Sequence, residues 1–272
     1  MFESWLAHPS TKHLSIDDPQ TTLNRRRIIQ EKKFLRLIYE DWYASIIAAL
    51  PAGEGKLLEL GSGAGFFRQF IPDLITSEIF HLPGVDAVMD AQQLPLSDGV
   101  LRGIVMINVM HHLPEPRLFF SEACRCLRPG GVIIMIEPWV TVWSTLVYRF
   151  LHHEPFHPKA AAWEFPAQGP LSGANAALPW IIFERDRSKF DQEFPRVRLR
   201  KLELVMPFRY LLSGGVSKIS LCPGWTYEVW RQLEEALKPC LSRLAMFAQI
   251  QLVRVGNASG MAEFTGEKLC EP

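Results

Sequence analysis

Apolar and polar positions follow two different patterns along this chain of 272 residues. Between residues 22 and 50 the apolar positions recur mostly at steps of three or four, with charged residues between them. This spacing predicts one or two amphipathic helices that end at Pro51 and Gly53. The apolar positions concerned are Ile28, Leu35, Ile38, Trp42, Ile46 and Leu50.

From residue 56 onward, short apolar runs predict strands at residues 56–60, 74–77 and 88–90. The runs at 103–108 and 132–137 are continuously apolar, which is typical of strands covered on both faces. Between these two runs, residues 114–127 predict a helix with Pro116 in its first turn, and residues 128–131 end it. Strands that alternate with helices predict an α/β fold with a doubly wound, mostly parallel sheet.

The second half of the chain loses this alternation. Residues 139–196 are rich in aromatic residues, histidine, proline and glycine, so we interpret them as an insertion or lid. Residues 197–208 predict a strand, 225–244 a helix and 245–255 a last strand. The expected organisation is therefore an N-terminal arm with helices (1–50), a core (51–138), the insertion (139–196), a segment that completes the sheet (197–256) and a tail (257–272).

Composition narrows the classes of function and partner. Lysine plus arginine and aspartate plus glutamate both number 29, so no net field favours nucleic acid as a partner. The first residues lack the pattern of a secretory signal, which predicts a cytoplasmic protein. Five scattered cysteines do not predict a disulfide framework, and the apolar stretch 139–151 is shorter than the roughly 20 residues that span a bilayer.

A glycine-rich turn follows the first predicted strand. Residues 58–65 read Leu-Glu-Leu-Gly-Ser-Gly-Ala-Gly, and the aromatic run after them predicts a helix. Glycine permits a tight turn and close approach of a ligand to the backbone. The sixth position counted from Gly61 is Phe66, which disfavours a dinucleotide fingerprint, and no lysine follows Gly65, which disfavours a phosphate loop. The hypothesis of a nicotinamide oxidoreductase is therefore supported only by the predicted order of strand, turn and helix.

The segment 58–65 resembles the E/DxGxGxG motif of class I S-adenosylmethionine-dependent methyltransferases of the type 11 kind. Further segments are similar to the family's motifs and occur in its order: Glu78 after the second strand, DAQQLPL at 90–96, NVMHHL at 108–113 and LRPGG at 127–131. The resemblance covers about residues 50–138. It implies a Rossmann-like, seven-stranded sheet and S-adenosyl-L-methionine as the cofactor.

The resemblance also implies roles for single residues. The glycine turn would lie under the methionine and ribose parts of the cofactor, Glu78 would accept hydrogen bonds from the ribose hydroxyls, and Asp90 with Ala91 would face the adenine. Glu59 would lie near the methionine amino group, with Asn108 and Val109 beside the methionine part. The implied cofactor residues are Glu59, Gly61, Ser62, Gly63, Ala64, Gly65, Glu78, Asp90, Ala91, Asn108 and Val109.

The chain departs from the family pattern at two places. Leu101-Arg102-Gly103 stands where many members have an aspartate, and the segment between the second and third strands is too short for a full helix.

Histidines supply the candidate base for removing a proton from a methyl acceptor. His111 and His112 follow the fourth strand, where an open α/β fold places its ligand crevice, and imidazole suits general-base chemistry. The alternative is that one of them packs under the sheet edge. A second group, His152, His153 and His157 around Glu154, lacks a further ligand set of recognisable spacing, so no metal site is predicted.

Two features indicate the acceptor. Aromatic residues of the insertion are expected to wall an apolar acceptor pocket, and the basic stretch 25–36 is a candidate contact for an anionic group. The sequence thus predicts an S-adenosylmethionine-dependent methyltransferase that acts on a small-molecule, glycan or lipid-linked acceptor, with peripheral membrane contact and oligomeric state left open. The alternative is a non-catalytic, S-adenosylmethionine-binding regulatory protein of the same fold. The aromatic residues are Trp139, Trp143, Phe150, Phe156, Trp163, Phe165 and Trp180.

Overall fold

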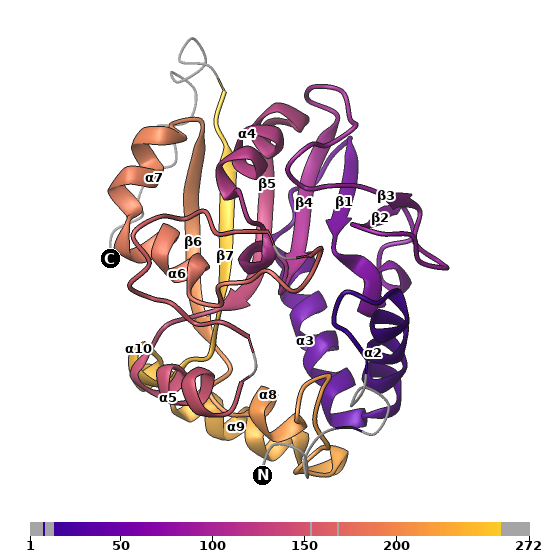
Figure 1. Ribbon diagram of the computed structural model, residues 1–272, viewed down its shortest axis with the longest axis vertical. Coiled ribbons are helices and arrows are strands. Elements are labelled where there is room, and N and C mark those ends of the chain that lie inside the picture. The colour runs from indigo at the N-terminus through magenta and orange to yellow at the C-terminus, as the bar shows by residue number, and fades with distance from the viewer. Residues whose placement is uncertain (1–7, 9–13, 153, 168, 257–272) are drawn as a thin grey trace, which may run out of the picture.

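A twisted sheet of seven strands organises the molecule (Figure 1). The computed structural model describes residues 8, 14–152, 154–167 and 169–256, and within them the strand order is β3–β2–β1–β4–β5–β7–β6. Strands β1 to β5 are parallel, and β7 runs antiparallel to both neighbours, β5 and β6. The predicted α/β fold with a mostly parallel sheet is confirmed. The strands are β1 Lys56–Leu60, β2 Leu74–Glu78, β3 Ala87–Val88, β4 Leu101–Ile107, β5 Leu127–Pro138, β6 Val197–Val205 and β7 Phe247–Arg254.

Each face of the sheet has its own apolar core, because successive side chains of a strand point to opposite faces. Ile133 and Met135 of β5 lie in the core shared with α4, α6 and α7, whereas Ile134 and Ile136 lie in the core shared with α2 and α3. The first group of helices comprises α4 Pro116–Cys126, α6 Leu178–Trp180, the π-turn Ile181–Arg185 and α7 Arg187–Glu193. The second group comprises α2 Pro19–Glu31 and α3 Lys33–Ala49.

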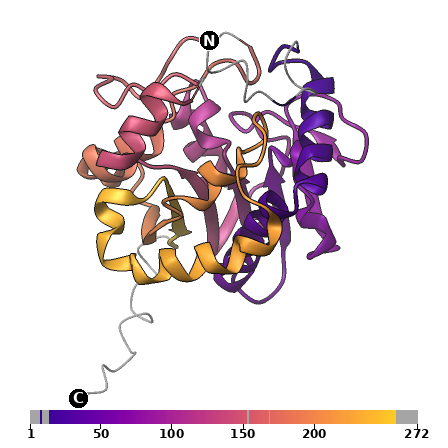
Figure 2. The same cartoon turned by 90° about the horizontal axis from the view of Figure 1, so that it is seen from below.

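Further helices gather at the carboxyl edge of the parallel strands (Figures 1 and 2). The predicted helix at 225–244 is divided into α9 and α10 by a 3-10 turn at Lys238–Cys240, because Pro239 lacks the amide hydrogen that a continuous helix needs. No helix among the described residues combines the length and apolar character needed to cross a membrane. The helices at this edge are α5 Val142–Phe150, α8 Arg209–Ser213, α9 Tyr227–Ala236 and α10 Leu241–Leu244.

Two expectations about local structure were wrong. The glycine turn is followed by 3-10 turns at Ser62–Ala64 and Phe67–Gln69 rather than by an α-helix, since Pro72 and the start of β2 at Leu74 leave little room. Residues 128–131 do not separate α4 from the next strand but belong to β5. A bulge absorbs them, so that Leu101 pairs with Leu127 and Gly103 pairs with Val132.

Candidate functional site

A cavity of about 430 Å³ opens at the carboxyl ends of β1, β2 and β4. It lies beside the point where the chain order reverses between β1 and β4, which is where open α/β sheets bind ligands. Its volume falls in the range of about 300–1,000 Å³ that is common for small-molecule sites. Four parts of the chain line the cavity: α2 and α3, the loops after the strands, the insertion, and the segment from α8 to β7.

The glycine turn forms one wall. Gly61 has a φ of 69°, and a Cβ atom there would lie 2.4 Å from the Val109 side chain, so the turn and the loop after β4 touch. Gly61, Ala64 and Val109 line the cavity. Ser62, Gly63 and Gly65, also predicted as cofactor residues, are not among the lining residues.

These three residues support the turn from behind. The Ser62 hydroxyl donates to the Glu59 carbonyl oxygen at 3.1 Å, and a Cβ atom on Gly63 would meet Glu78 and Thr22 at 2.5 Å each. A Cβ atom on Gly65 would lie 2.8 Å from the Tyr43 hydroxyl. The turn therefore fits tightly between β2 and the helices α2 and α3.

The two predicted acidic residues take different positions. Glu78 lines the cavity, and its carboxylate accepts hydrogen bonds from the backbone amides of Gly63 at 3.0 Å and Ile79 at 2.9 Å. Glu59 is buried beneath the turn, outside the cavity lining, where burial raises the pKa of its carboxyl group to about 7.

The loops after β3 and β4 complete this wall. Asp90 and Ala91 line the cavity, and one Asp90 carboxylate oxygen accepts the Gln92 backbone amide at 2.8 Å. Asn108 also lines it, with a left-handed φ of 55° that asparagine tolerates better than most residues. Its backbone amide donates to the Ile136 carbonyl oxygen at 2.9 Å, which fixes the end of β4 against β5.

Both predicted histidines line the cavity, and a buried carboxylate orients the first of them. Glu137, at the end of β5, is fully buried and accepts the backbone amides of Val109 and Met110 with one carboxylate oxygen. Its other oxygen lies 2.7 Å from His111 Nδ1. His112 Nδ1 lies 3.2 Å from the Gly173 carbonyl oxygen.

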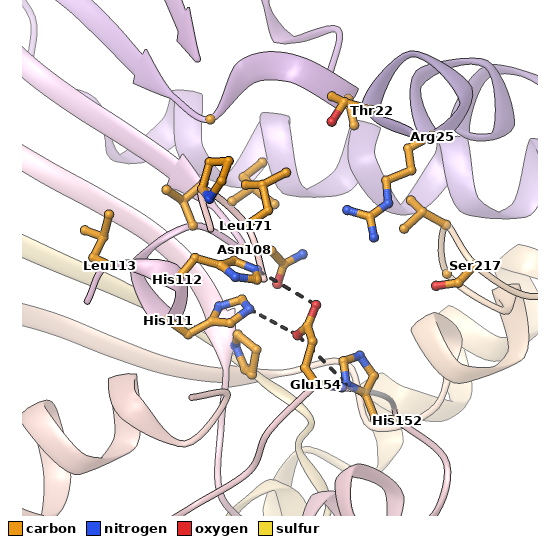
Figure 3. A pocket seen from close by; sticks show the side chains of 18 of the residues that line it. Thr22, Arg25, Asn108, His111, His112, Leu113, His152, Glu154, Leu171 and Ser217 are labelled. Atoms are coloured by element: carbon orange, nitrogen blue, oxygen red, sulfur yellow. Dashed lines mark hydrogen bonds and ion pairs between the residues drawn. The ribbon is translucent and has the colours of Figure 1, made fainter. Parts of the chain in front are cut away.

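The insertion brings a second carboxylate to these rings (Figure 3). Glu154 lies 3.3 Å from His111 Nε2 and 3.8 Å from His112 Nε2, with His152 Nδ1 3.9 Å away on its other side. Burial opposes charge on both rings, but Glu137 and Glu154 raise the pKa of His111 to about 10. Burial and the neighbouring His111 lower the pKa of His112 to about 4, so the two adjacent histidines differ in charge at neutral pH.

Sequence reasoning missed three residues of the site. Glu137 could have been noticed as the single acid in an otherwise apolar strand, and Arg25 as part of the basic stretch. Arg25 lines the cavity from α2, across from Glu154 (Figure 3). Glu154 had been considered only with its neighbours in sequence. His157 is exposed, and His153 lies outside the described residues.

None of the seven aromatic residues that were expected to wall an acceptor pocket lines the cavity. Trp139 and Trp163 are buried in the core beneath α4 and α7, and Phe150 is 71% exposed. Four other aromatic residues line the cavity instead, namely Tyr39, Tyr210, Phe247 and, from α5 within the insertion, Tyr148.

The basic stretch is mostly engaged within the molecule. Arg26 donates to the Gly63 carbonyl oxygen at 2.9 Å, and Lys32 donates to the carbonyl oxygens of Gly215 and Lys218. Arg27 and Arg36 pair with acids one turn further along their helices. The stretch therefore fastens α2 and α3 over the site rather than forming a free basic face.

Comparison with known proteins agrees with the motif order. Residues 58–135 match the family model described as a methyltransferase domain. An uncharacterized methyltransferase of Mycobacterium leprae is 26% identical over 167 residues, which are 56% of this chain and 56% of the relative. An uncharacterized 37.1 kDa protein in a transposon of Streptomyces fradiae is 39% identical over 59 residues, 21% of this chain and 17% of that protein. The chain thus spans about half or less of the length of these curated relatives.

Solved structures share the fold at low identity. A chain from the Haloferax volcanii complex of the Trm112 methyltransferase activator with a provisionally assigned methyltransferase has a TM-score of 0.51 at 12% identity, over 89% of this chain and 98% of that one. Geranyl diphosphate C-methyltransferase from Streptomyces coelicolor has a TM-score of 0.50 at 11% identity, over 92% and 89% of the two chains.

Proposed function

We propose that this chain, whose residues 58–135 match a methyltransferase domain, is a class I S-adenosylmethionine-dependent methyltransferase that methylates a small molecule held between the glycine turn and the insertion. The observation that carries the proposal is the convergence of the turn at Gly61, the acids Glu78 and Asp90, and the loop at Asn108 on one cavity. Each of these elements ends at the same edge of the sheet.

The cavity suits the shape and polarity of the cofactor. A side chain on Gly61 would clash with Val109, so the turn keeps its backbone open to a ligand. Glu78 has acceptor capacity beyond its two backbone hydrogen bonds, which suits the two ribose hydroxyls. Asp90 and Ala91 would hold the adenine, with Asn108 and Val109 against the methionine part.

Arg25 is the residue that we assign to the cofactor carboxylate. Its guanidinium group lies in the cavity from the side opposite Glu154, while neighbouring Arg26 and Arg27 contact other groups (Figure 3). A guanidinium group forms paired hydrogen bonds with a carboxylate, each stronger than a bond between neutral groups.

The acceptor side is formed by His112 and the insertion. When bound, the cofactor supplies an electrophilic methyl group on a sulfonium sulfur. The chain must align the acceptor and take up its proton. Since the Gly173 carbonyl can only accept, His112 Nδ1 carries the hydrogen and Nε2 presents a lone pair to the cavity. His111 is less suited to this task, because the carboxylates of Glu137 and Glu154 contact its two ring nitrogens.

An acceptor with an apolar tail is favoured by the outer face of α5. Val142, Leu146 and Phe150 are 70%, 50% and 71% exposed and lie one turn apart. The next residue, Leu151, is partly exposed and lines the cavity. A lipid-linked acceptor would extend its tail over this face, and this face would also be the site of peripheral membrane contact.

The cofactor test is calorimetry of the full chain with S-adenosylhomocysteine, the product of methyl transfer. We expect micromolar binding and a loss of affinity of roughly 10- to 150-fold in Arg25→Gln, since a hydrogen bond to a charged group contributes about 1.5–3 kcal/mol. Arg27→Gln is the matched control, because Arg27 lies on the outer side of the same helix, paired with Glu31. No binding by folded protein would overturn the proposal.

Once cofactor binding has been measured, a second experiment identifies the acceptor. Extracts and panels of hydroxylated, aminated and prenylated small molecules would be incubated with methyl-labelled cofactor. Transfer to one class identifies the acceptor. Cofactor binding without transfer across the whole panel would favour the second candidate, a regulatory protein that binds the cofactor without turnover.

A further inference from the structure

We infer that His111, His112 and Glu154 form a binding site for a divalent transition-metal ion of the zinc type. The site is distinct from the cofactor residues and does not depend on the proposed methyl transfer. It revises the expectation from sequence that the chain has no metal site.

The spacing of the three side chains suits a shared metal ion. Ligand atoms held about 2.1 Å from a tetrahedral metal lie about 3.4 Å from one another. Glu154 oxygens lie 3.3 Å from His111 Nε2 and 3.8 Å from His112 Nε2, and one donor atom from each residue falls within 4.8 Å of the others. Charge-assisted hydrogen bonds are shorter, at about 2.7–2.9 Å.

Both rings are oriented as metal ligands are. His111 Nδ1 lies 2.7 Å from the Glu137 carboxylate, and His112 Nδ1 lies 3.2 Å from the Gly173 carbonyl oxygen. When each Nδ1 donates its hydrogen to that oxygen and a bound ion displaces the Nε2 proton of His111, each Nε2 presents a lone pair to the ion. A histidine ligand almost always donates its other ring nitrogen to a carboxylate or carbonyl group in this way.

Glu137 is a rigid support for this arrangement. It is fully buried, and its second oxygen accepts the backbone amides of Val109 and Met110. The ring of His111 is thereby fixed to the loop after β4. Glu154 comes from the insertion, so a bound ion would connect the insertion to the sheet edge (Figure 3).

The ligand set indicates the class of metal. Two imidazoles and one carboxylate suit Zn²⁺, Co²⁺, Mn²⁺ or Fe²⁺, whereas Mg²⁺ and Ca²⁺ prefer oxygen ligands alone. Three protein ligands that line a cavity leave a coordination position open to a small molecule. If the proposed function holds, the bound ion would take over the role proposed for His112 as base, because His112 Nε2 then coordinates the ion. An acceptor hydroxyl bound at the open position would release its proton to solvent more readily, since a metal lowers the pKa of a bound oxygen acid.

The test is titration of tag-free, full-length protein with Zn²⁺, and with Co²⁺ followed by visible absorption, with and without S-adenosylhomocysteine. We expect one bound ion per chain and the absorption of four- or five-coordinate Co²⁺. His112→Ala and the conservative Glu154→Gln should each weaken binding at least 100-fold. Glu137→Gln should weaken it 10- to 100-fold, the range for residues that orient a ligand.

His157→Ala is the matched control, since His157 is exposed on the same insertion outside the cluster, and should leave metal affinity unchanged. No ion on folded wild-type protein, or equal affinity in His112→Ala and Glu154→Gln, would overturn the inference. Retained S-adenosylhomocysteine binding in that case would leave the proposed function standing. Metal binding without S-adenosylhomocysteine binding would support the metal site and overturn the proposed function.

Discussion

Burial of the Glu59 carboxyl group lowers the stability of the folded protein when this group is ionised. Glu59 lies beneath the glycine turn at 4% exposure, and burial raises the pKa of its carboxyl group to about 7. A carboxyl group with a raised pKa in the folded protein binds more protons than in the unfolded chain. Its stabilising contribution is therefore complete below the ordinary value of 4.5 and is lost as the pH rises to about 7.

Replacing Glu59 with glutamine should stabilise the cofactor-free protein at pH 8 but not near pH 5. The expected gain at pH 8 is about 1–3 kcal/mol, since one pKa unit corresponds to about 1.4 kcal/mol. Urea unfolding of both proteins across this pH range measures it. Glu54→Gln, at an exposed position, is the control. A difference between wild type and Glu59→Gln that does not change with pH would contradict this account.

The 3-10 turn at Phe67–Gln69, which follows the glycine turn in place of the predicted helix, is stabilised by contacts with α3. Phe66 and Phe67 belong to short 3-10 turns, in which fewer backbone amides find partners than in an α-helix. Tyr43 of α3 compensates, because its hydroxyl oxygen accepts the Phe66 amide at 2.9 Å and its ring stacks on Phe67 with centroids 4.6 Å apart. The N-terminal helices therefore hold the glycine turn in shape.

Tyr43→Phe should destabilise the protein by about 1–3 kcal/mol, because it leaves a buried backbone amide without its acceptor. Affinity for S-adenosylhomocysteine should fall as well, since the turn at Gly61–Gly65 loses its anchor. Denaturant unfolding and calorimetry measure the two effects. Unchanged stability together with unchanged affinity would show that α3 does not support the turn.

On the scale of the whole molecule, the N-terminal segment and the insertion meet across the cavity. Asp17 accepts the backbone amides of Leu171 at 2.7 Å and Ser172 at 2.9 Å. Partial burial would raise the pKa of Asp17, but hydrogen bonds from Ser172 and Leu171 hold it below the ordinary value. The contact is therefore intact at neutral pH and is lost on strong acidification.

Asp17→Ala should loosen residues 169–172 without unfolding the sheet. Amide hydrogen exchange in this segment should rise about tenfold, in line with the loss of hydrogen bonds to a charged group. Binding of S-adenosylhomocysteine should weaken several-fold. Asp18→Ala removes the neighbouring N-cap of α2 instead and should leave exchange at 169–172 unchanged. Equal exchange in both variants would argue against the contact.

The sequence by itself determined the strands, the order of the motifs and the class of fold. Apolar periodicity and a glycine turn are local signals, and residues such as Gly61, Asp90 and Asn108 lie on the cavity because strand ends meet at one edge of a sheet. It did not indicate that Ser62 and Gly65 would support the turn rather than line the cavity, because that depends on how α3 packs against them.

Only the tertiary structure decided which charged residues lie at the cavity or contact its two histidines. Glu137, Glu154 and Arg25 come from a strand end, the insertion and the first helix, and no spacing along the chain relates them to His111 and His112. Their proximity results from packing between distant segments, which apolar periodicity does not encode. For the same reason, no metal site was predicted from the segment HHEPFHP. Its Glu154 faces His111 and His112, which belong to another loop.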